Sequence, residues 1–369
     1  MRKVSILSFV LVILVACNRD PKVLHDRCIA SGNKYFQSGK YKEASIFYRR
    51  ALQLDPKSPE AYYRLGLTDM TLRNYPAAAR SLGRAWELNP ANEDAGVRLA
   101  EIYLRAYVAN PQINRPVLKE ARSSIDRLLK LNPRSYDALR LDADLATASN
   151  DRAKAIQRLR EANEVKPWQP ETVTALMQNL ALSGEQKEAE DLGEKFLTHN
   201  KTFAPVYDLL YLYARQDSNP ARAEAILKAK VDNLASDGPS YIQLATFQYS
   251  RNLRPEMRAT LDRLRASNVT HAHILTGDFY FHIAEFDSAT QSYLEGEKAE
   301  PKLRAAYQKR MAVVLMTQGR NQEAMQIATR LHTEDPKDSE AAAIHASLLA
   351  KGTPQQVQSA IGELESLAG

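Results

Sequence analysis

Glycines and cysteines are scarce in this chain of 369 residues, and each shortage excludes a kind of site. It has only 14 glycines and neither a Gly-x-Gly-x-x-Gly fingerprint nor a phosphate loop, both of which need glycines to bring backbone close to a phosphate. The His-Glu-x-x-His and Gly-x-Ser-x-Gly patterns are also missing. We therefore expect a protein that is not an enzyme and that uses no cofactor and no metal.

Blocks of like charge and long apolar runs are scarce too. The formal net charge is +6, and no five like charges cluster, so the sequence does not indicate a nucleic-acid site. One apolar run, from Val4 to Val15, is about twelve residues long, which is shorter than the roughly 20 residues of a membrane-spanning helix. Because Arg2 and Lys3 precede it, the run is typical of a signal peptide.

What the chain does have is a regular spacing of prolines. The intervals are 34, 34 and 35 residues in the pairs Pro56 and Pro90, Pro133 and Pro167, and Pro301 and Pro336. A proline cannot continue a helix, so each one marks the end of a unit. A period of about 34 residues is that of a helix–turn–helix repeat.

Between these prolines the sequence resembles tetratricopeptide repeats. That repeat has small residues at two positions where Gly32 and Ala44 stand in the first unit, and a large residue at the position of Tyr48. The resemblance implies an all-α, right-handed solenoid of about nine to ten helix pairs. We expect four N-terminal repeats in 25–169, degenerate repeats in 170–269 and C-terminal repeats with an incomplete last unit in 270–369. Nine extra residues in the third repeat predict a protruding loop near 107–116.

The start of the chain resembles a bacterial lipobox. Leu14-Val15-Ala16-Cys17 directly follows the apolar run. The resemblance implies a signal peptide over 1–16, a covalent lipid on Cys17 and a lipidated linker over 17–24. It also implies a place in the bacterial cell envelope, and Asn18 after the cysteine favours the periplasmic face of the outer membrane. After cleavage, Cys28 has no internal disulfide partner and is expected to be buried.

In tetratricopeptide proteins the first helix of each pair (helix A) lines a concave binding surface. That resemblance predicts a groove for an extended peptide or a partner helix. The predicted groove residues are Asn33, Phe36, Tyr63, Leu67, Glu101, Arg105, Arg140, Asp144, Asp208, Arg215, Tyr249, Asp278 and Phe281. The relatives that grip a C-terminal carboxylate use a lysine–asparagine clamp, but Ile29 stands where the lysine would be. We interpret Asp142 and Asp144 as a solvated helix face, and His271 and His273 as exposed loop residues.

The combined features predict a membrane-anchored, non-enzymatic scaffold that binds protein or peptide partners of the cell envelope. It resembles the repeat lipoproteins of exopolysaccharide and surface-protein sorting systems. Two alternatives stay open: an assembly factor for pili or outer-membrane proteins, and a repeat appendage of an enzyme whose catalytic domain is absent here. The last helix carries uncovered apolar residues, among them Val357 and Ile361. They could pair with a second copy, or the sequence could be the start of a longer protein.

The register of the first repeat predicts the effect of one substitution. Ala44 falls where helices A and B approach most closely, so Ala44→Glu brings a charge and extra volume into that contact. We expect a loss of several kcal/mol, on the order of 3. Circular dichroism melting measures it, and a melting temperature that barely changes would contradict the assigned register.

Overall fold

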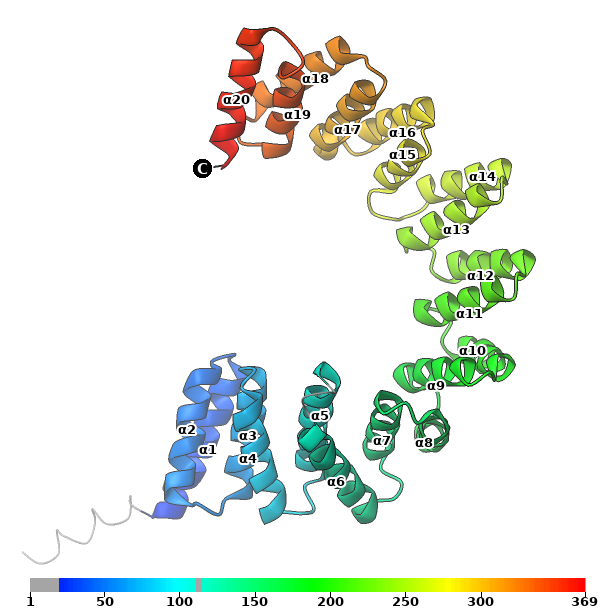
Figure 1. The fold of residues 1–369 in the computed structure, drawn as a ribbon. Coiled ribbons are helices and arrows are strands. Elements are labelled where there is room, and N and C mark those ends of the chain that lie inside the picture. The colour runs from blue at the N-terminus through cyan, green and yellow to red at the C-terminus, as the bar shows by residue number, and fades with distance from the viewer. Residues whose placement is uncertain (1–19, 111–114, 369) are drawn as a thin grey trace, which may run out of the picture. The chain divides into compact units, whose positions relative to one another are not determined.

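A computed structural model describes residues 20–110 and 115–368, and these residues form twenty α-helices, a short 3-10 helix and no strand (Figure 1). No helix among them is long and apolar enough to cross a membrane. The predicted signal peptide and Cys17 lie outside the described residues. The all-α repeat architecture is confirmed, with ten helix pairs.

The chain forms two compact units, the first ending at His199 and the second beginning at Asn200. The helices of the first unit are α1 Pro21–Gln37, α2 Tyr41–Leu54, α3 Pro59–Thr71, α4 Tyr75–Leu88, α5 Glu93–Ala109, α6 Arg115–Leu131, α7 Tyr136–Ala148, α8 Arg152–Val165, α9 Pro170–Leu182 and α10 Gln186–His199. This division differs from the predicted segments, because the degenerate repeats of 170–269 are split between the units.

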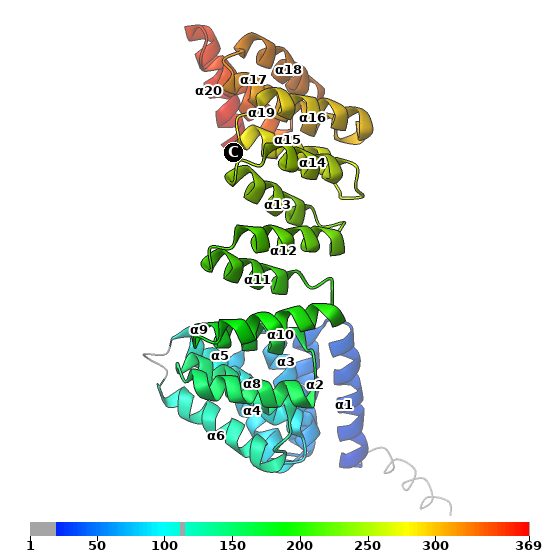
Figure 2. The same ribbon diagram turned by 90° about the vertical axis from the view of Figure 1, so that its right-hand side faces the viewer.

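Within the second unit, helix pairs follow one another in chain order, as α11 to α14 do in Figure 2. The helices are α11 Ala204–Gln216, α12 Pro220–Asn233, α13 Gly238–Ser250, α14 Arg254–Arg265, α15 Ala272–His282, α16 Phe286–Ala299, η2 Pro301–Leu303, α17 Arg304–Thr317, α18 Asn321–Glu334, α19 Ser339–Leu349 and α20 Pro354–Ala368. The last unit, expected to be incomplete, thus has both helices.

The evenly spaced prolines lie just beyond the second helices of their pairs. Each of the six helices that they follow ends two residues before its proline. Helix starts carry their own signals: Ser58 accepts a hydrogen bond from the Ala61 backbone N–H at 3.2 Å, and Pro59 is the first helical residue. A capping hydroxyl satisfies a free N–H, and a proline there loses no hydrogen bond. Local sequence therefore determines where these helices begin and end.

In several pairs, close packing joins a small residue on helix A to a large one on helix B. A Cβ built on Gly32 would lie 2.5 Å from Tyr48 Cε1, and one on Gly277 would lie 2.2 Å from Tyr293 Cε1. Ala44 has no exposed surface. In the degenerate fifth repeat the sizes are exchanged, because Met177 and Gly193 are both buried at the same spacing. The weak consensus there still permits a complete helix pair.

One predicted boundary needs correction, and the predicted loop near 107–116 lies partly outside the described residues. The first helix begins at Pro21, inside the expected linker, because Asp20 accepts a hydrogen bond from Lys22 N at 2.9 Å and caps it. In the third repeat, the extra residues mostly lengthen the helices: α5 and α6 have 17 residues each, against 13 and 14 in α3 and α4. Buried Leu104 and Tyr107 continue the apolar face of α5, which explains why it stays helical. Residues 111–114 lie outside the described chain.

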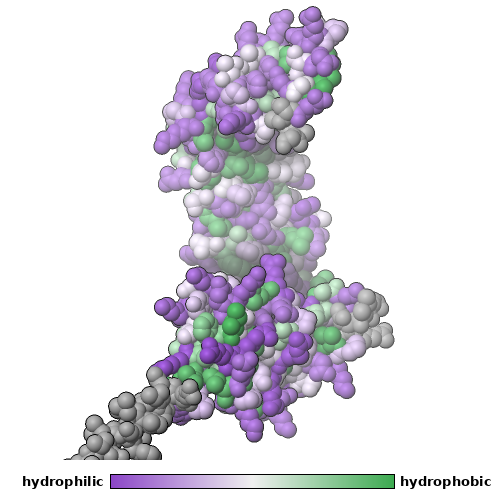
Figure 3. Space-filling model, turned by 90° about the vertical axis from the view of Figure 1, so that its left-hand side faces the viewer, coloured by the Kyte–Doolittle hydropathy of each residue, from purple (hydrophilic) through white to green (hydrophobic). Residues whose placement is uncertain are grey.

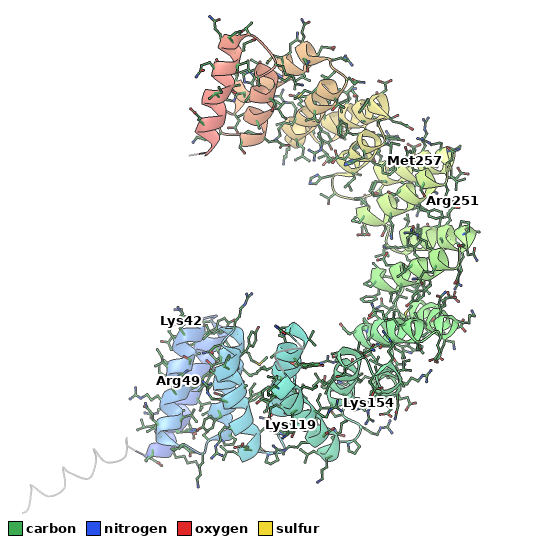
Figure 4. The ribbon with its side chains drawn as sticks, in the orientation of Figure 1. Lys42, Arg49, Lys119, Lys154, Arg251 and Met257 are labelled. Atoms are coloured by element: carbon green, nitrogen blue, oxygen red, sulfur yellow. The ribbon has the colours of Figure 1, made fainter. Side chains whose placement is uncertain are left out.

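Asp142 does not lie on a solvated face as interpreted from the sequence. It is 2% exposed, and its carboxylate lies 2.7 Å from Lys154 Nζ and 2.8 Å from Arg158 Nε on α8 (Lys154 is labelled in Figure 4). A buried charge is tolerated when it is paired and hydrogen-bonded. Asp142 therefore joins the two helices of the fourth repeat. Cys28, in contrast, is buried and unpaired as predicted.

The turns between helices A and B require a left-handed residue. In eight of the ten pairs the second turn residue has positive φ: Gly39, Arg73, Asn150, Gly184, Ser218, Asn252, Ala284 and Gly319. A side chain in this region costs about 1 kcal/mol relative to glycine. Three of the eight positions are already glycine, whereas Ala284 has φ 60°.

These turns predict a matched pair of substitutions with opposite effects. Ala284→Gly should stabilise the second unit by about 0.5–1 kcal/mol because it removes the left-handed strain. Gly319→Ala, where no atom lies within 4 Å of the new Cβ, should destabilise it by a similar amount through the same strain. Denaturant midpoints measure both, and a shift of the same sign in the two variants would contradict the argument.

Candidate functional site

A groove lies over the first helices of three successive pairs in the second unit, α11, α13 and α15. Its larger part, of about 1060 Å³, is lined by side chains that include Tyr211, Arg215, Ile242, Phe247 and Arg251. A second part, of about 520 Å³, is lined by Tyr249, Asp278, Phe279, His282 and Ile283. The two parts share Ile242, Thr246 and Leu275, so they form one α11–α15 groove.

The smaller part of the α11–α15 groove has mostly apolar walls, whereas the larger part is lined by polar and apolar side chains in similar measure. Ile242 and Leu275 lie where its two parts meet, and both are half-buried. Apolar side chains reach the surface among polar ones on the face of the second unit in Figure 3. A concave, largely apolar surface with a few polar groups is the usual form of a binding site.

Two arginines give the groove its positive charge. Arg215 is exposed, with its guanidinium 5.8 Å from the centre of the Tyr211 ring, and Arg251 is also exposed (Figure 4). Neither forms an ion pair with another described residue, whereas nearby Arg254 lies 2.7 Å from Glu285. Unpaired guanidinium groups beside an apolar wall can bind a carboxylate in a bidentate manner.

The structure brings three predicted residues of the second unit into this groove: Arg215, Tyr249 and Asp278. Asp278 is already engaged, since it accepts hydrogen bonds from Tyr293 Oη at 2.7 Å and from Arg310 Nε at 2.9 Å. Burial, followed by this bond to Asp278, raises the pKa of Tyr293 far above its ordinary value. Asp278 therefore orders its own repeat as well as lining the groove.

The other two predicted residues of this unit have structural contacts elsewhere. Asp208 lies 2.6 Å from Lys230 Nζ, and Lys230 is 6% exposed, so the carboxylate neutralises a buried lysine. Phe281 packs against Phe286, with ring centres 5.9 Å apart. Neither lines the groove.

Several groove residues were not predicted from the sequence. Ile242 and Thr246 stand at positions 5 and 9 of the seventh repeat, counted from Gly238. Positions 5 and 9 belong to the same set of groove-facing helix-A positions as that of Tyr249. Ile242 and Thr246 could therefore have been predicted by using every such position of the repeat. Leu275 stands outside that pattern, and only the packing of α15 brings it to the groove.

In the first unit, four of the predicted residues belong to a charged network. The network consists of Tyr63, Asp94, Arg98, Glu101, Arg140 and Asp144 on α3, α5 and α7. Tyr63 Oη donates to Asp94 at 2.5 Å, and Arg98 Nη1 lies 3.1 Å from Glu101. Arg140 then lies 3.2 Å from Glu101 and 3.0 Å from Asp144.

The network satisfies its own polar groups. Burial, and then the hydrogen bond to Asp94, raises the pKa of Tyr63 to about 12. Burial also raises the pKa of Asp144, although Arg140 opposes this shift. This helix-A face is therefore occupied by internal ion pairs, and it offers a partner fewer free groups than the α11–α15 groove does.

The remaining predicted residues of this unit have separate surroundings. Tyr48 Oη donates to Asn33 at 2.8 Å, and Phe36 meets Tyr41 edge to face at 5.2 Å. Leu67 is half-buried, and Arg105 is exposed with its guanidinium 5.9 Å from the Tyr75 ring. The structure does not bring these residues into one site.

The described residues include one group of side chains close enough to share a metal ion: His332, His345 and Glu363. His271 and His273 are not part of it. His271 is an exposed residue that lies 3.3 Å from Glu300.

A family model described as TPR repeat matches residues 32–69, which covers the end of α1, all of α2 and most of α3. The other helix pairs repeat that arrangement. The chain therefore has the all-helical solenoid fold of tetratricopeptide repeats.

Two curated relatives are similar over different lengths. The DnaJ homolog subfamily C member 7 homolog of Dictyostelium discoideum is 24% identical over 326 residues, covering 85% of this chain and 56% of that protein. The RNA polymerase II-associated protein 3 of Homo sapiens is 29% identical over 107 residues, covering 29% of this chain and 15% of that protein. The chain thus spans about half of the first relative and a smaller part of the second.

Solved structures with similar helices each cover about half of the chain. MamA from Desulfovibrio magneticus RS-1 has a TM-score of 0.43 and 16% identity, over 48% of this chain and 96% of that one. PilW, a type IV pilus biogenesis factor, has a TM-score of 0.46 and 17% identity, over 58% of this chain and 95% of that one. At this level the likeness concerns helix arrangement and does not extend to partners.

The charged network of the first unit predicts a pH-dependent effect. Arg140→Met leaves Glu101 and Asp144 facing each other without the guanidinium, which should cost about 1 kcal/mol at pH 7 because the pair is partly exposed. Arg140 lowers the pKa of Asp144 in the folded protein, so its loss raises that pKa; the penalty should therefore be present at pH 7, where Asp144 is ionised, and shrink as the pH falls toward 4. Urea unfolding of both proteins at pH 4 and pH 7 measures the difference. An equal difference at both values would contradict this account.

Proposed function

We propose that the chain is a non-enzymatic, membrane-anchored scaffold that binds a segment of a partner protein in the α11–α15 groove. The observation that carries the proposal is the groove itself: an apolar wall crossing three helix pairs, with two unpaired arginines at one part of it. Tetratricopeptide-type solenoids present extended surfaces of this kind to protein partners.

The chemistry of the groove favours one kind of occupant. The wall around Ile242 and Leu275 matches a large apolar side chain, and Arg215 and Arg251 match a carboxylate. The occupant is therefore a peptide segment in which an acidic residue stands close to a large apolar residue. Contacts of this sort give affinity through a few anchors.

The place of action rests on the start of the sequence. The lipobox-like segment ending at Cys17 supports a lipid anchor, and two or more acyl chains suffice for stable attachment at about 0.8 kcal/mol per buried methylene. The scaffold then acts in the bacterial cell envelope, in export or assembly of surface components such as exopolysaccharide or sorted proteins. The partners are proteins of that envelope.

A peptide selection tests the groove. Random peptides displayed on phage are selected against the full-length chain, and the enriched peptides are synthesised. We expect them to pair a large apolar residue with an acidic one. Arg215→Glu with Arg251→Glu should then lower their affinity at least about tenfold, because both charge-assisted contacts become repulsive.

The control reverses the same amount of charge outside the groove. Lys298→Glu with Lys337→Glu changes two exposed residues that form no ion pair with a described residue, and it should leave the affinity within about twofold. Circular dichroism establishes that both double variants stay folded. Equal losses in the two double variants, or enriched peptides without acidic residues, would remove the support for this function.

A further inference from the structure

Two histidines and a glutamate from three different helices meet near the end of the described chain. His332 belongs to α18, His345 to α19 and Glu363 to α20. One ligand atom from each lies within 4.8 Å of the other two. The histidine rings stack with centres 5.2 Å apart, and His345 Nδ1 lies 3.0 Å from a Glu363 carboxylate oxygen.

We propose that His332, His345 and Glu363 form a binding site for a divalent transition-metal ion of the zinc class, which ties the last helix to the rest of the solenoid. Imidazole nitrogens and a carboxylate oxygen are ligands that zinc, cobalt and nickel accept. Three protein ligands leave one position, which a water molecule takes.

One atom in the cluster lacks a partner in the described chain. His332 Nδ1 is buried and makes no hydrogen bond. A buried polar atom without a hydrogen bond is costly. A metal ion at this nitrogen removes that cost, and an ordinary His345–Glu363 ion pair does not.

For the three side chains to bind one ion, their ligand atoms must move closer together. Bonds of about 2.0–2.1 Å place neighbouring tetrahedral ligands about 3.3 Å apart, compared with the present limit of 4.8 Å. The two rings must turn out of their parallel stack so that both lone pairs point at one ion. This rotation concerns side chains that are 12% exposed for His345 and 22% exposed for Glu363.

The consequence concerns α20. This helix packs against α19, and its Val357 and Ile361 side chains are 36% and 44% exposed. A shared ion would connect Glu363 on α20 to α18 as well as to α19. Because ion binding favours the folded arrangement, it stabilises the end of the solenoid.

The first experiment measures binding to the full-length chain, purified without a histidine tag and stripped of metal with a chelator. Zn²⁺ should bind saturably with a stoichiometry of one. Co²⁺ should give a visible absorption band with intensity typical of a histidine and carboxylate site. His332→Gln, His345→Gln and Glu363→Gln should each weaken Zn²⁺ binding at least about tenfold, because each removes one ligand.

The chain supplies a matched control. His271 pairs with Glu300 much as His345 pairs with Glu363. Among the described residues, however, the His271–Glu300 pair is not part of a group of three possible metal ligands. His271→Gln should therefore leave Zn²⁺ affinity unchanged. A loss of affinity equal to that of His345→Gln would show that the ion binds elsewhere and would overturn the proposal.

Hydrogen exchange provides a readout that does not depend on affinity. Zn²⁺ should slow amide exchange in residues 354–368 of the wild-type chain and have no effect there in His332→Gln, which leaves the His345–Glu363 contact in place. Circular dichroism confirms that the variants fold. Absence of a saturable site, or equal protection of 354–368 in His332→Gln, would show that these side chains form only an ion pair and would refute the proposal.

Discussion

Close contact between helix A and helix B, made in the best-matched repeats by a small residue on A and a large residue on B, is the interaction on which the repeat fold depends. Gly32 with Tyr48 and Gly277 with Tyr293 show it in its tightest form, because any added Cβ would overlap the ring. The contact sets the distance between the helices of a pair. That distance in turn determines which faces of the first helices remain available at the surface. Core packing of this density tolerates exchange of sizes but little change in total volume.

The two units use their helix-A faces differently. In the first unit, Glu101 and Arg140 join successive first helices through partly buried ion pairs. In the second unit, Ile242 and Leu275 leave an apolar surface, and Arg215 finds no acidic partner there. A surface that satisfies its own charges gains little from a partner, whereas an apolar surface with unpaired guanidinium groups gains from burial and from charge-assisted hydrogen bonds. We therefore place the proposed binding function in the second unit.

Within the described chain, no further repeat covers α20. Natural solenoids usually solve this with a polar terminal helix. Here α20 keeps exposed apolar residues but also presents Glu363 to two histidines on the preceding helices. A shared metal ion would replace part of the missing packing by coordination. The order of the final helix would then depend on metal supply.

The sequence by itself determined the helices and their pairing. Proline spacing, capping residues such as Ser58 and the small residues at helix crossings act over a few residues, so they can be read from the chain directly. The tertiary structure decided which side chains meet across helices. The sequence places Asp142 on a solvated face and Asp208 in a groove, but both neutralise buried or half-buried cations. His332 and His345 come together from separate helices. These contacts between side chains depend on how neighbouring helices pack. The 3.6-residue period of a single helix does not specify that geometry.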